Sequence, residues 1–75
     1  MNTTVAHLKK GQKAIIVDFD SDKIPLKLIE MGCLPGNDVE VIQVAPFGDP
    51  FILMINDNQL VVRLETAQEI KIELK

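Results

Sequence analysis

One histidine and one cysteine, His7 and Cys33, are the candidates for nucleophilic or acid–base chemistry in this sequence. Nucleophilic catalysis needs a serine, threonine or cysteine held within hydrogen-bond reach of a base, which is usually a histidine. Here the histidine lies in the N-terminal segment and the cysteine lies beside a Pro-Gly turn, with no third residue that carries a recognisable orienting signature. The four glycines also lack the spacing of a phosphate-binding loop. The sequence therefore predicts a protein that acts by binding, without catalytic residues and without a cofactor.

Three aspartates, Asp18, Asp20 and Asp22, are the best candidates for metal ligands. Transition metals bind carboxylate, imidazole and thiolate groups, so His7 or Cys33 could complete such a site. The trio lacks the glycine and the distal glutamate of a calcium loop, and the same carboxylates suit the start of a helix. Helix capping is the favoured interpretation and no metal site is assigned. A module that binds or senses Fe²⁺ or Mn²⁺ remains an alternative function.

The composition limits the class of protein. The chain has 75 residues, of which 47% are hydrophobic, and its formal net charge is −3. Its basic residues are scattered, with Lys9-Lys10 as the only tight pair, which argues against a nucleic-acid partner. A lone cysteine cannot form an intramolecular disulfide and is typical of a reducing compartment. The N-terminus has no apolar segment and the longest apolar run is Phe51–Ile55, so we expect a cytoplasmic chain without signal peptide or membrane insertion.

The first half of the chain predicts one strand and one helix. Lys13–Phe19 has the pattern of a strand that is buried mostly on one side, and the residues before it are expected to form only a lead-in with one helical turn. Apolar residues at helical spacing follow Pro25, and Gly32 stands where a left-handed C-terminal residue is wanted. These features predict a helix of about nine residues. Leu34-Pro35-Gly36-Asn37 then matches a type II turn.

The second half predicts strands separated by turns. Between Val41 and Ile42 the apolar phase of the strand Val39–Ala45 slips by one residue, which indicates a β-bulge or a sharp bend. The other predicted elements are a connection at Ala45–Pro50, a strand at Phe51–Ile55, a hairpin at Asn56–Asn58, a strand at Leu60–Leu64, a helical turn at Glu65–Glu69 and a strand at Ile70–Leu74. Together they predict a mainly β, five-stranded SH3-like barrel, with one helix after the first strand and a helical turn before the last. The whole chain, residues 1–75, is expected to be a single domain.

Four segments of the chain resemble motifs of the FeoA family. Glu30–Gly36 resembles the motif (E/S)-(L/M)-G-x-x-P-G, and Ala45–Pro50 resembles A-P-x-G-D-P, at the correct spacing. The segment Leu64–Ile70 is similar to the closing motif of the family, and Leu8–Ala14 is similar to its opening motif. The resemblance covers nearly the whole chain. It implies an SH3-like domain with a role in bacterial ferrous iron uptake.

The resemblance also implies a partner. FeoA proteins are small cytosolic companions of FeoB, a membrane iron transporter that carries a cytosolic GTP-binding domain. The chain is accordingly expected to be an accessory or regulatory protein that acts by contact with the FeoB iron transporter. One departure lies at Val62-Arg63-Leu64, which carries a single arginine where family members often have a more basic stretch. If that positive charge contributes to docking on the cytosolic face of the transporter, docking of this chain is expected to be weaker or differently placed.

The two turn motifs supply most of the candidate partner contacts. Pro46 and Pro50 restrict the backbone around Gly48, and Asp49 can accept backbone N–H bonds in an Asx turn, so the loop would be a rigid holder for Phe47. An exposed aromatic ring favours a covering partner, although folding back as a lid on the barrel is an equal alternative for Phe47. The candidate partner-binding residues are Leu34, Pro35, Phe47, Asp49, Pro50 and Arg63.

Self-association is a further alternative. Phe51–Ile55 is apolar along its whole length and is expected at an edge of the sheet. Apolar edge strands invite pairing with another chain. An alternative function is therefore an SH3-like interaction domain that forms homo-oligomers through this strand.

Overall fold

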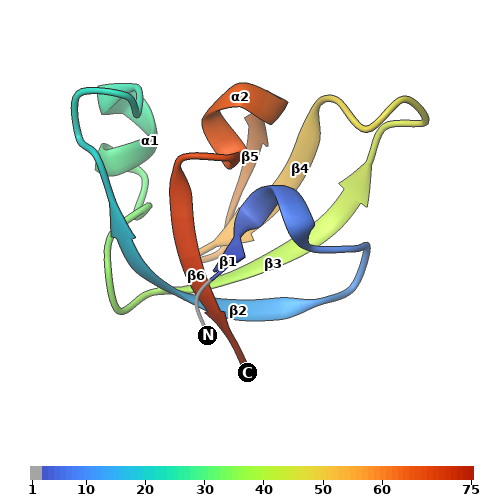
Figure 1. Cartoon of the computed structure of the whole chain (residues 1–75). Coiled ribbons are helices and arrows are strands. Elements are labelled where there is room, and N and C mark those ends of the chain that lie inside the picture. The colour runs from blue at the N-terminus through green and yellow to red at the C-terminus, as the bar shows by residue number, and fades with distance from the viewer. Residues whose placement is uncertain (1–2) are drawn as a thin grey trace.

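The computed structural model describes residues 3–75, and strands dominate it (Figure 1). The elements in chain order are β1 (Thr3–Thr4), the 3₁₀ turn η1 (Val5–His7), β2 (Lys13–Phe19), α1 (Leu26–Glu30), β3 (Asp38–Val44), β4 (Phe51–Ile55), β5 (Asn58–Val62), α2 (Leu64–Ala67) and β6 (Ile70–Leu74). The predicted bounds of β2, β4 and β6 are confirmed, and β3 and β5 begin one or two residues earlier than predicted. Within residues 3–75 no helix has the length and apolarity needed to cross a bilayer.

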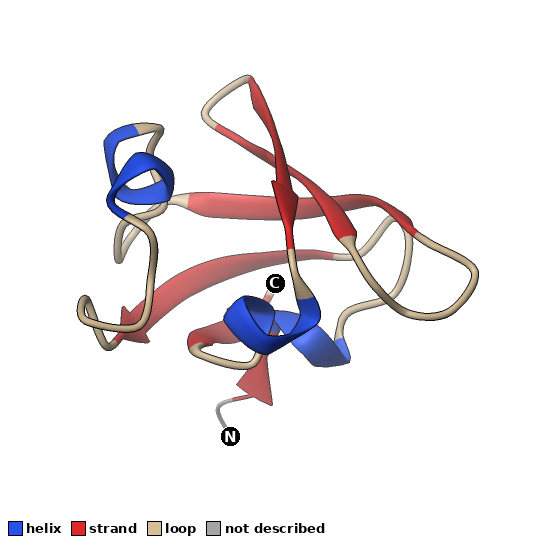
Figure 2. Cartoon of the chain, turned by 90° about the horizontal axis from the view of Figure 1, so that it is seen from above, coloured by secondary structure: helices blue, strands red, loops and turns tan. Residues whose placement is uncertain are grey.

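One antiparallel sheet contains all six strands, in the order β1-β6-β2-β3-β4-β5. The register of β3 shifts against β4 between Val41 and Gln43, which confirms the bulge predicted from the phase slip at Ile42. A second shift lies in β2 between Ile16 and Asp18, opposite β6. Such bulges increase the twist and bend of a strand. The sheet therefore curls around its own core, as the predicted SH3-like architecture requires (Figures 1 and 2).

The core inside the curled sheet is aliphatic. Among residues 3–75 no buried residue is polar or charged. Each strand contributes alternate positions, so that in β2 Ala14 and Ile16 are buried while Ile15 is 36% exposed. The turn η1 and the helix α2 lie side by side over one end of the core (Figure 2). The largest fully buried side chains include Ile16, Leu53, Ile55, Ile70 and Ile72.

Helix α1 has five residues and is shorter than predicted. Asp20 Oδ1 accepts the N–H of Asp22 at 3.0 Å, and the carbonyl of Asp20 accepts the N–H of Lys23 at 2.9 Å, so this segment closes a turn of its own. Pro25 occupies the N-cap position, without a side-chain cap hydrogen bond. The predicted capping role of the aspartates is therefore wrong, because local turn bonds compete with helix formation. Gly32 ends the helix at a φ of 107°, as predicted.

Two predictions about the edges of the sheet are wrong. The lead-in contains a sixth strand, β1, which pairs Thr3 with Ile72 and Thr4 with Lys71. A strand of two residues has no readable periodicity, and its partner lies at the other end of the chain. Strand β4 is interior, because a tight turn with positive φ at Asn56 and Asp57 folds β5 onto its outer side. Self-association through an exposed β4 edge is therefore excluded, and the open edge belongs to β5.

Candidate docking surface

The loop between β3 and β4, residues 45–50, protrudes at the upper right of Figure 1. Its backbone is closed by two hydrogen bonds: Gly48 N–H donates to the Ala45 carbonyl at 2.8 Å, and Ala45 N–H donates to the Pro50 carbonyl at 3.1 Å. Gly48 adopts a φ of 81°, which suits a residue without a side chain. The peptide bond between Asp49 and Pro50 is cis. The loop therefore has a defined shape that its own backbone bonds maintain.

Asp49 fastens this loop to helix α2. Its Oδ1 accepts the N–H of Leu64 at 2.9 Å, and its Oδ2 lies 3.5 Å from Nη2 of Arg63. Leu64 is the first residue of α2, and the N–H groups at a helix start have no acceptor within the helix. Asp49 thus caps α2 from a distant segment, where a local Asx turn was predicted. The ion pair adds little, because the Arg63 side chain is 71% exposed.

Replacing Asp49 tests this anchor. Asp49→Ala removes the acceptor for the Leu64 N–H and is expected to lower the free energy of unfolding by about 1 kcal/mol, the typical cost of a lost helix cap. Asp49→Asn keeps Oδ1 as an acceptor, removes only the charge, and is expected to stay within about 0.5 kcal/mol of the wild type. Urea unfolding measures both values. Equal losses in the two variants would contradict the capping role.

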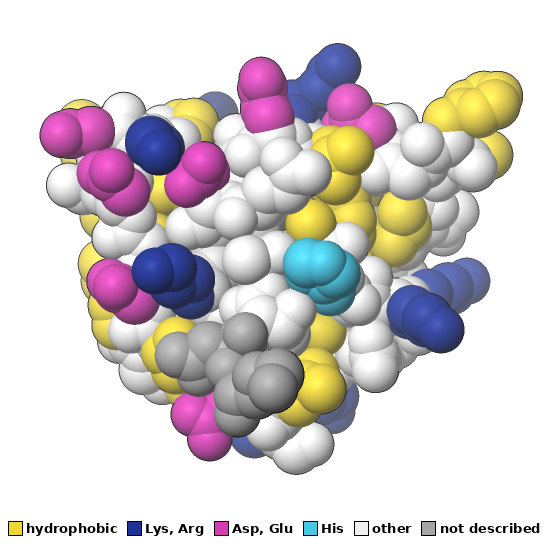
Figure 3. All heavy atoms as spheres, viewed as in Figure 1, with side chains coloured by type: hydrophobic (Ala, Val, Ile, Leu, Met, Phe, Trp, Pro, Cys, Tyr) yellow, Lys and Arg dark blue, Asp and Glu magenta, His cyan; other side chains and the backbone are white. Residues whose placement is uncertain are grey.

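Phe47 stands at the tip of the loop and is 98% exposed. The alternative in which its ring covers the barrel is therefore wrong, because the closed turn directs the tip away from the core and the buried ring nearby is that of Phe51. Figure 3 shows a hydrophobic group projecting at the corner where Figure 1 places this loop. Burying apolar surface is worth about 25 cal/mol per Å². A partner that covers this ring would gain that free energy.

The predicted contact residues fall into two groups. Four share the corner described above: Phe47, Asp49, Pro50 and Arg63. Leu34 and Pro35 lie shortly before the first residue of β3, at the end of that strand opposite the loop. The seven residues of β3 span about 23 Å. Leu34 is 42% exposed, and the N–H of Asn37 bonds to its carbonyl at 3.1 Å in the predicted type II turn. The structure therefore separates the two motifs, and the candidate contacts do not form one continuous surface.

Two exposed apolar side chains were missed as candidate contacts. Leu26 on α1 is 68% exposed and Val61 on β5 is 64% exposed. Leu26 is the first residue of α1 and projects into solvent. Val61 lies between Leu60 and Val62, which are buried, and points to the opposite face of β5. The proximity of α1 and β5 is a long-range feature that no local pattern signals.

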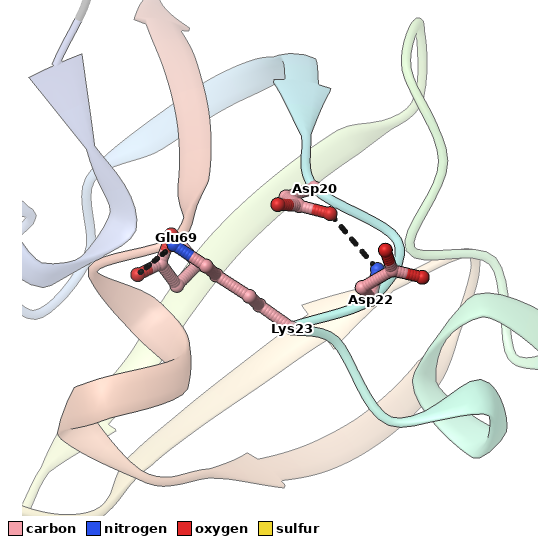
Figure 4. A network of polar contacts seen from close by, with 4 residues as sticks. All are labelled: Asp20, Asp22, Lys23 and Glu69. Atoms are coloured by element: carbon pink, nitrogen blue, oxygen red, sulfur yellow. Dashed lines mark hydrogen bonds and ion pairs between the residues drawn. The ribbon is translucent and has the colours of Figure 1, made fainter.

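The candidate metal ligands do not converge. Among the described residues there is no group of three or more His, Cys, Asp or Glu side chains placed to hold a metal ion. Asp20 bonds to the backbone of Asp22, and Nζ of Lys23 lies 3.8 Å from Oε1 of Glu69, so that these charges belong to the β2–α1 connection and its tie to the start of β6 (Figure 4). Figure 3 shows acidic side chains around a basic one at the same corner. The arrangement does not favour the metal-binding alternative.

Cys33 and His7 lie in unlike surroundings. Cys33 is 1% exposed, and burial raises the pKa of its thiol to about 11. His7 is exposed, with Nδ1 at 3.2 Å from Oγ1 of Thr4. The thiolate is the reactive and metal-binding form of cysteine, so a buried thiol that stays protonated suits neither role. Cys33 packs as a small apolar residue of the core.

The buried thiol predicts a loss of stability at alkaline pH. The pKa of Cys33 is about 11 in the folded chain against a usual value of 9.0, so the unfolded chain releases this proton first. Stability is therefore retained below about pH 9 and falls as the pH rises toward 11. Urea unfolding between about pH 9 and pH 11 is expected to show a steeper fall in the free energy of unfolding for the wild type than for Cys33→Ala.

Chemical labelling tests the burial of Cys33 directly. Iodoacetamide should label Cys33 only after unfolding, and labelling of the folded chain at the rate of free cysteine would contradict its burial.

Comparison with known proteins places this geometry in a family. Residues 3–74 match the FeoA domain family. The chain is 34% identical over 71 residues to the Fe(2+) transport protein A/Fe(2+) transporter FeoB fusion protein of Porphyromonas gingivalis. That alignment covers 93% of this chain and 8% of the fusion protein, so the chain corresponds to a small part of that relative.

Solved structures share the fold. Iron(II) transport protein A from Clostridium thermocellum superposes with a TM-score of 0.83 at 30% identity, over 96% of this chain and 45% of that one. FeoA of Stenotrophomonas maltophilia, a procaryotic SH3 domain protein in complex with zinc, superposes with a TM-score of 0.81 at 20% identity, over 95% and 89% of the two chains. The SH3-like fold predicted from the strand pattern is thereby confirmed.

The family match runs through all four motif segments, from the opening residues to the last strand. It includes the loop that holds Phe47 and the helix that Asp49 caps. The chain therefore belongs to the FeoA domain family, which is associated with ferrous iron transport.

Proposed function

We propose that this chain is a cytoplasmic, non-enzymatic accessory protein of ferrous iron uptake that binds the cytosolic part of a FeoB-type transporter. Membership of the FeoA domain family supports the link to iron transport. The Porphyromonas gingivalis relative carries FeoA and FeoB in one polypeptide, which supports close contact between the two. The protonated, buried thiol of Cys33 supports a function by contact, because it provides no nucleophile.

The observation that carries the proposal is the presentation of Phe47. Its ring is 98% exposed on a loop closed by backbone hydrogen bonds and anchored through Asp49. Such a preorganised loop loses little conformational freedom on binding, so the buried apolar area contributes directly to affinity. Aromatic side chains commonly supply most of the binding energy of an interface. Arg63 beside the loop is exposed and can pair with a carboxylate on the transporter.

Calorimetric titration of the full chain into the purified cytosolic domain of the cognate transporter tests the proposal. Saturable binding is expected, and repeating the titration with GDP and with a non-hydrolysable GTP analogue shows whether the nucleotide state alters affinity. Both proteins are checked for folding by circular dichroism before mixing. The absence of binding in every nucleotide state would contradict the proposed partner.

A further inference from the structure

A second surface, which we call the α1–β5 groove, runs between α1 and the outer side of β5. It consists of two adjoining hollows that share Lys27, Leu28 and Val61. The first continues to Met31, Gln59 and Leu60, and the second continues to Pro25, Val62, Arg63 and Thr66. A hydrogen bond of 3.2 Å from Nδ2 of Asn58 to the Met31 carbonyl ties the two walls together at one end. The groove lies outside the loop that holds Phe47.

One wall of the groove is the open edge of the sheet. Strand β5 stands last in the strand order, so its outer edge pairs with no other strand of residues 3–75. Ile55 and Asn58 flank a two-residue turn and form a hydrogen-bonded pair, and such pairs recur at every second position of an antiparallel ladder. The intervening residues Gln59 and Val61 therefore direct their backbone N–H and C=O groups outward, toward the groove. Unpaired groups of this kind are a template for an added strand.

The lining of the groove is apolar with a positive rim. Val61 is 64% exposed on one wall, while Leu28 of α1 and Met31, which directly follows that helix, line the other. The charged residues of the lining are Lys27 and Arg63, both basic, in a chain whose net charge is −3. Arg63 forms an ion pair with Asp49, whereas Lys27 takes part in none of the ion pairs among residues 3–75. Local charge therefore favours a ligand that carries carboxylates.

We propose that the α1–β5 groove binds an extended acidic segment of a partner protein, which adds a strand to β5. The backbone of the segment would bond to Gln59 and Val61, its alternate apolar side chains would lie against Val61 and Leu28, and a carboxylate would pair with Lys27. A second copy of this chain is disfavoured as occupant, because its own edge strand, Asn58–Val62, carries no carboxylate and it would bring a second Lys27 to the same edge. The inference goes beyond the proposed function, since it requires neither Phe47 nor the transporter.

The test uses two fluorescein-labelled peptides and the full chain labelled with ¹⁵N. In the acidic peptide, valine and isoleucine alternate with aspartate and glutamate, and in the basic peptide lysine and arginine replace the acids. We expect saturable binding of the acidic peptide, with the largest amide shifts at Gln59 and Val61, and binding of the basic peptide weaker by about tenfold or more. Equal affinity for the two peptides, or shifts confined to other parts of the chain, would overturn the proposal.

Three variants of the groove and one control variant separate the contributions of the backbone, the apolar side chain and the charge. Val61→Pro removes the outward N–H, which an edge strand tolerates, and is expected to weaken the acidic peptide by about tenfold. Val61→Asp keeps the N–H and the exposed position but repels the acidic peptide, so it tests the site even if the proline variant does not fold. Lys27→Glu should weaken the acidic peptide by about tenfold. Lys10→Glu changes the net charge equally but lies in the connection before β2, and it should leave affinity unchanged.

Some outcomes would identify another occupant. Unchanged affinity in both Val61 variants would show that the peptide binds elsewhere and would overturn the proposal. Analytical ultracentrifugation of the chain alone tests whether a second copy occupies the groove. A dimer that Val61→Pro dissociates and that excludes the acidic peptide would overturn the proposal in favour of a second copy, whereas a monomer at every concentration supports it.

Discussion

Replacing Phe47 with alanine is expected to weaken binding to the cytosolic domain of the transporter by roughly 30-fold or more, the equivalent of about 2 kcal/mol. The free energy of unfolding is expected to stay within about 0.5 kcal/mol of the wild type. Both expectations follow from the 98% exposure of the ring, which contributes to an interface but not to the core. Calorimetric titration gives the first value and urea unfolding gives the second.

A matched control removes an exposed apolar side chain away from the loop. Leu74 is 55% exposed near the C-terminus, at the bottom of Figure 1, whereas the loop lies at the upper right. Leu74→Ala is expected to bind the transporter domain as the wild type does. Phe47→Leu should retain part of the affinity, because it keeps an apolar side chain at the tip. Equal affinities for Phe47→Ala and Leu74→Ala would show that the ring is not an anchor of the interface.

The largest effect on stability is expected from Leu53→Ala. Leu53 is 0% exposed in β4, paired with Val41 on one side and Leu60 on the other, and both neighbours are buried. Truncating such a leucine leaves a cavity and typically lowers the free energy of unfolding by about 2–5 kcal/mol. A core of this size rarely supplies more than about 3–5 kcal/mol in total. The variant should therefore be largely unfolded, as measured by far-ultraviolet circular dichroism and urea titration.

Ile52→Ala is the control for this substitution. Ile52 precedes Leu53, points to the opposite face of β4 and is only partly buried. It loses a side chain of the same size, and its expected cost is below about 1.5 kcal/mol, because less apolar surface leaves the core. A loss for Leu53→Ala no greater than that for Ile52→Ala would contradict the assignment of the inward face of β4.

Local patterns in the sequence predict most of the fold. Alternation placed β2 and β6 at their observed bounds, because burial of one face imposes a period of two on a strand, and the continuous apolar run Phe51–Ile55 placed β4. The phase slip at Ile42 predicted the bulge that bends β3. Helix α1 was predicted too long, because periodicity cannot weigh a helix start against the hydrogen bonds of the turn that begins at Asp20.

The candidate site was predicted in part. The proline and glycine spacing of the β3–β4 loop predicted a rigid turn with Phe47 at its tip, and the exposure of the ring agrees with this. The acceptor role of Asp49 was predicted, but its donor, the Leu64 N–H, lies 15 residues along the chain. The α1–β5 groove likewise joins segments that are distant in sequence. The roles of Leu34 and Pro35 in partner contact stay a prediction.

The most direct test of docking through the Phe47 loop is an NMR footprint of the ¹⁵N-labelled chain with the unlabelled cytosolic domain of the transporter. If the loop is the docking surface, the amides of Ala45, Phe47, Gly48 and Asp49, and that of Leu64, which Asp49 holds, should show the largest shifts or line broadening. The type II turn at residues 34–37 should change less, because it adjoins the other end of β3. A footprint centred on that turn, with the amides of Phe47 and Gly48 unperturbed, would contradict docking through the loop.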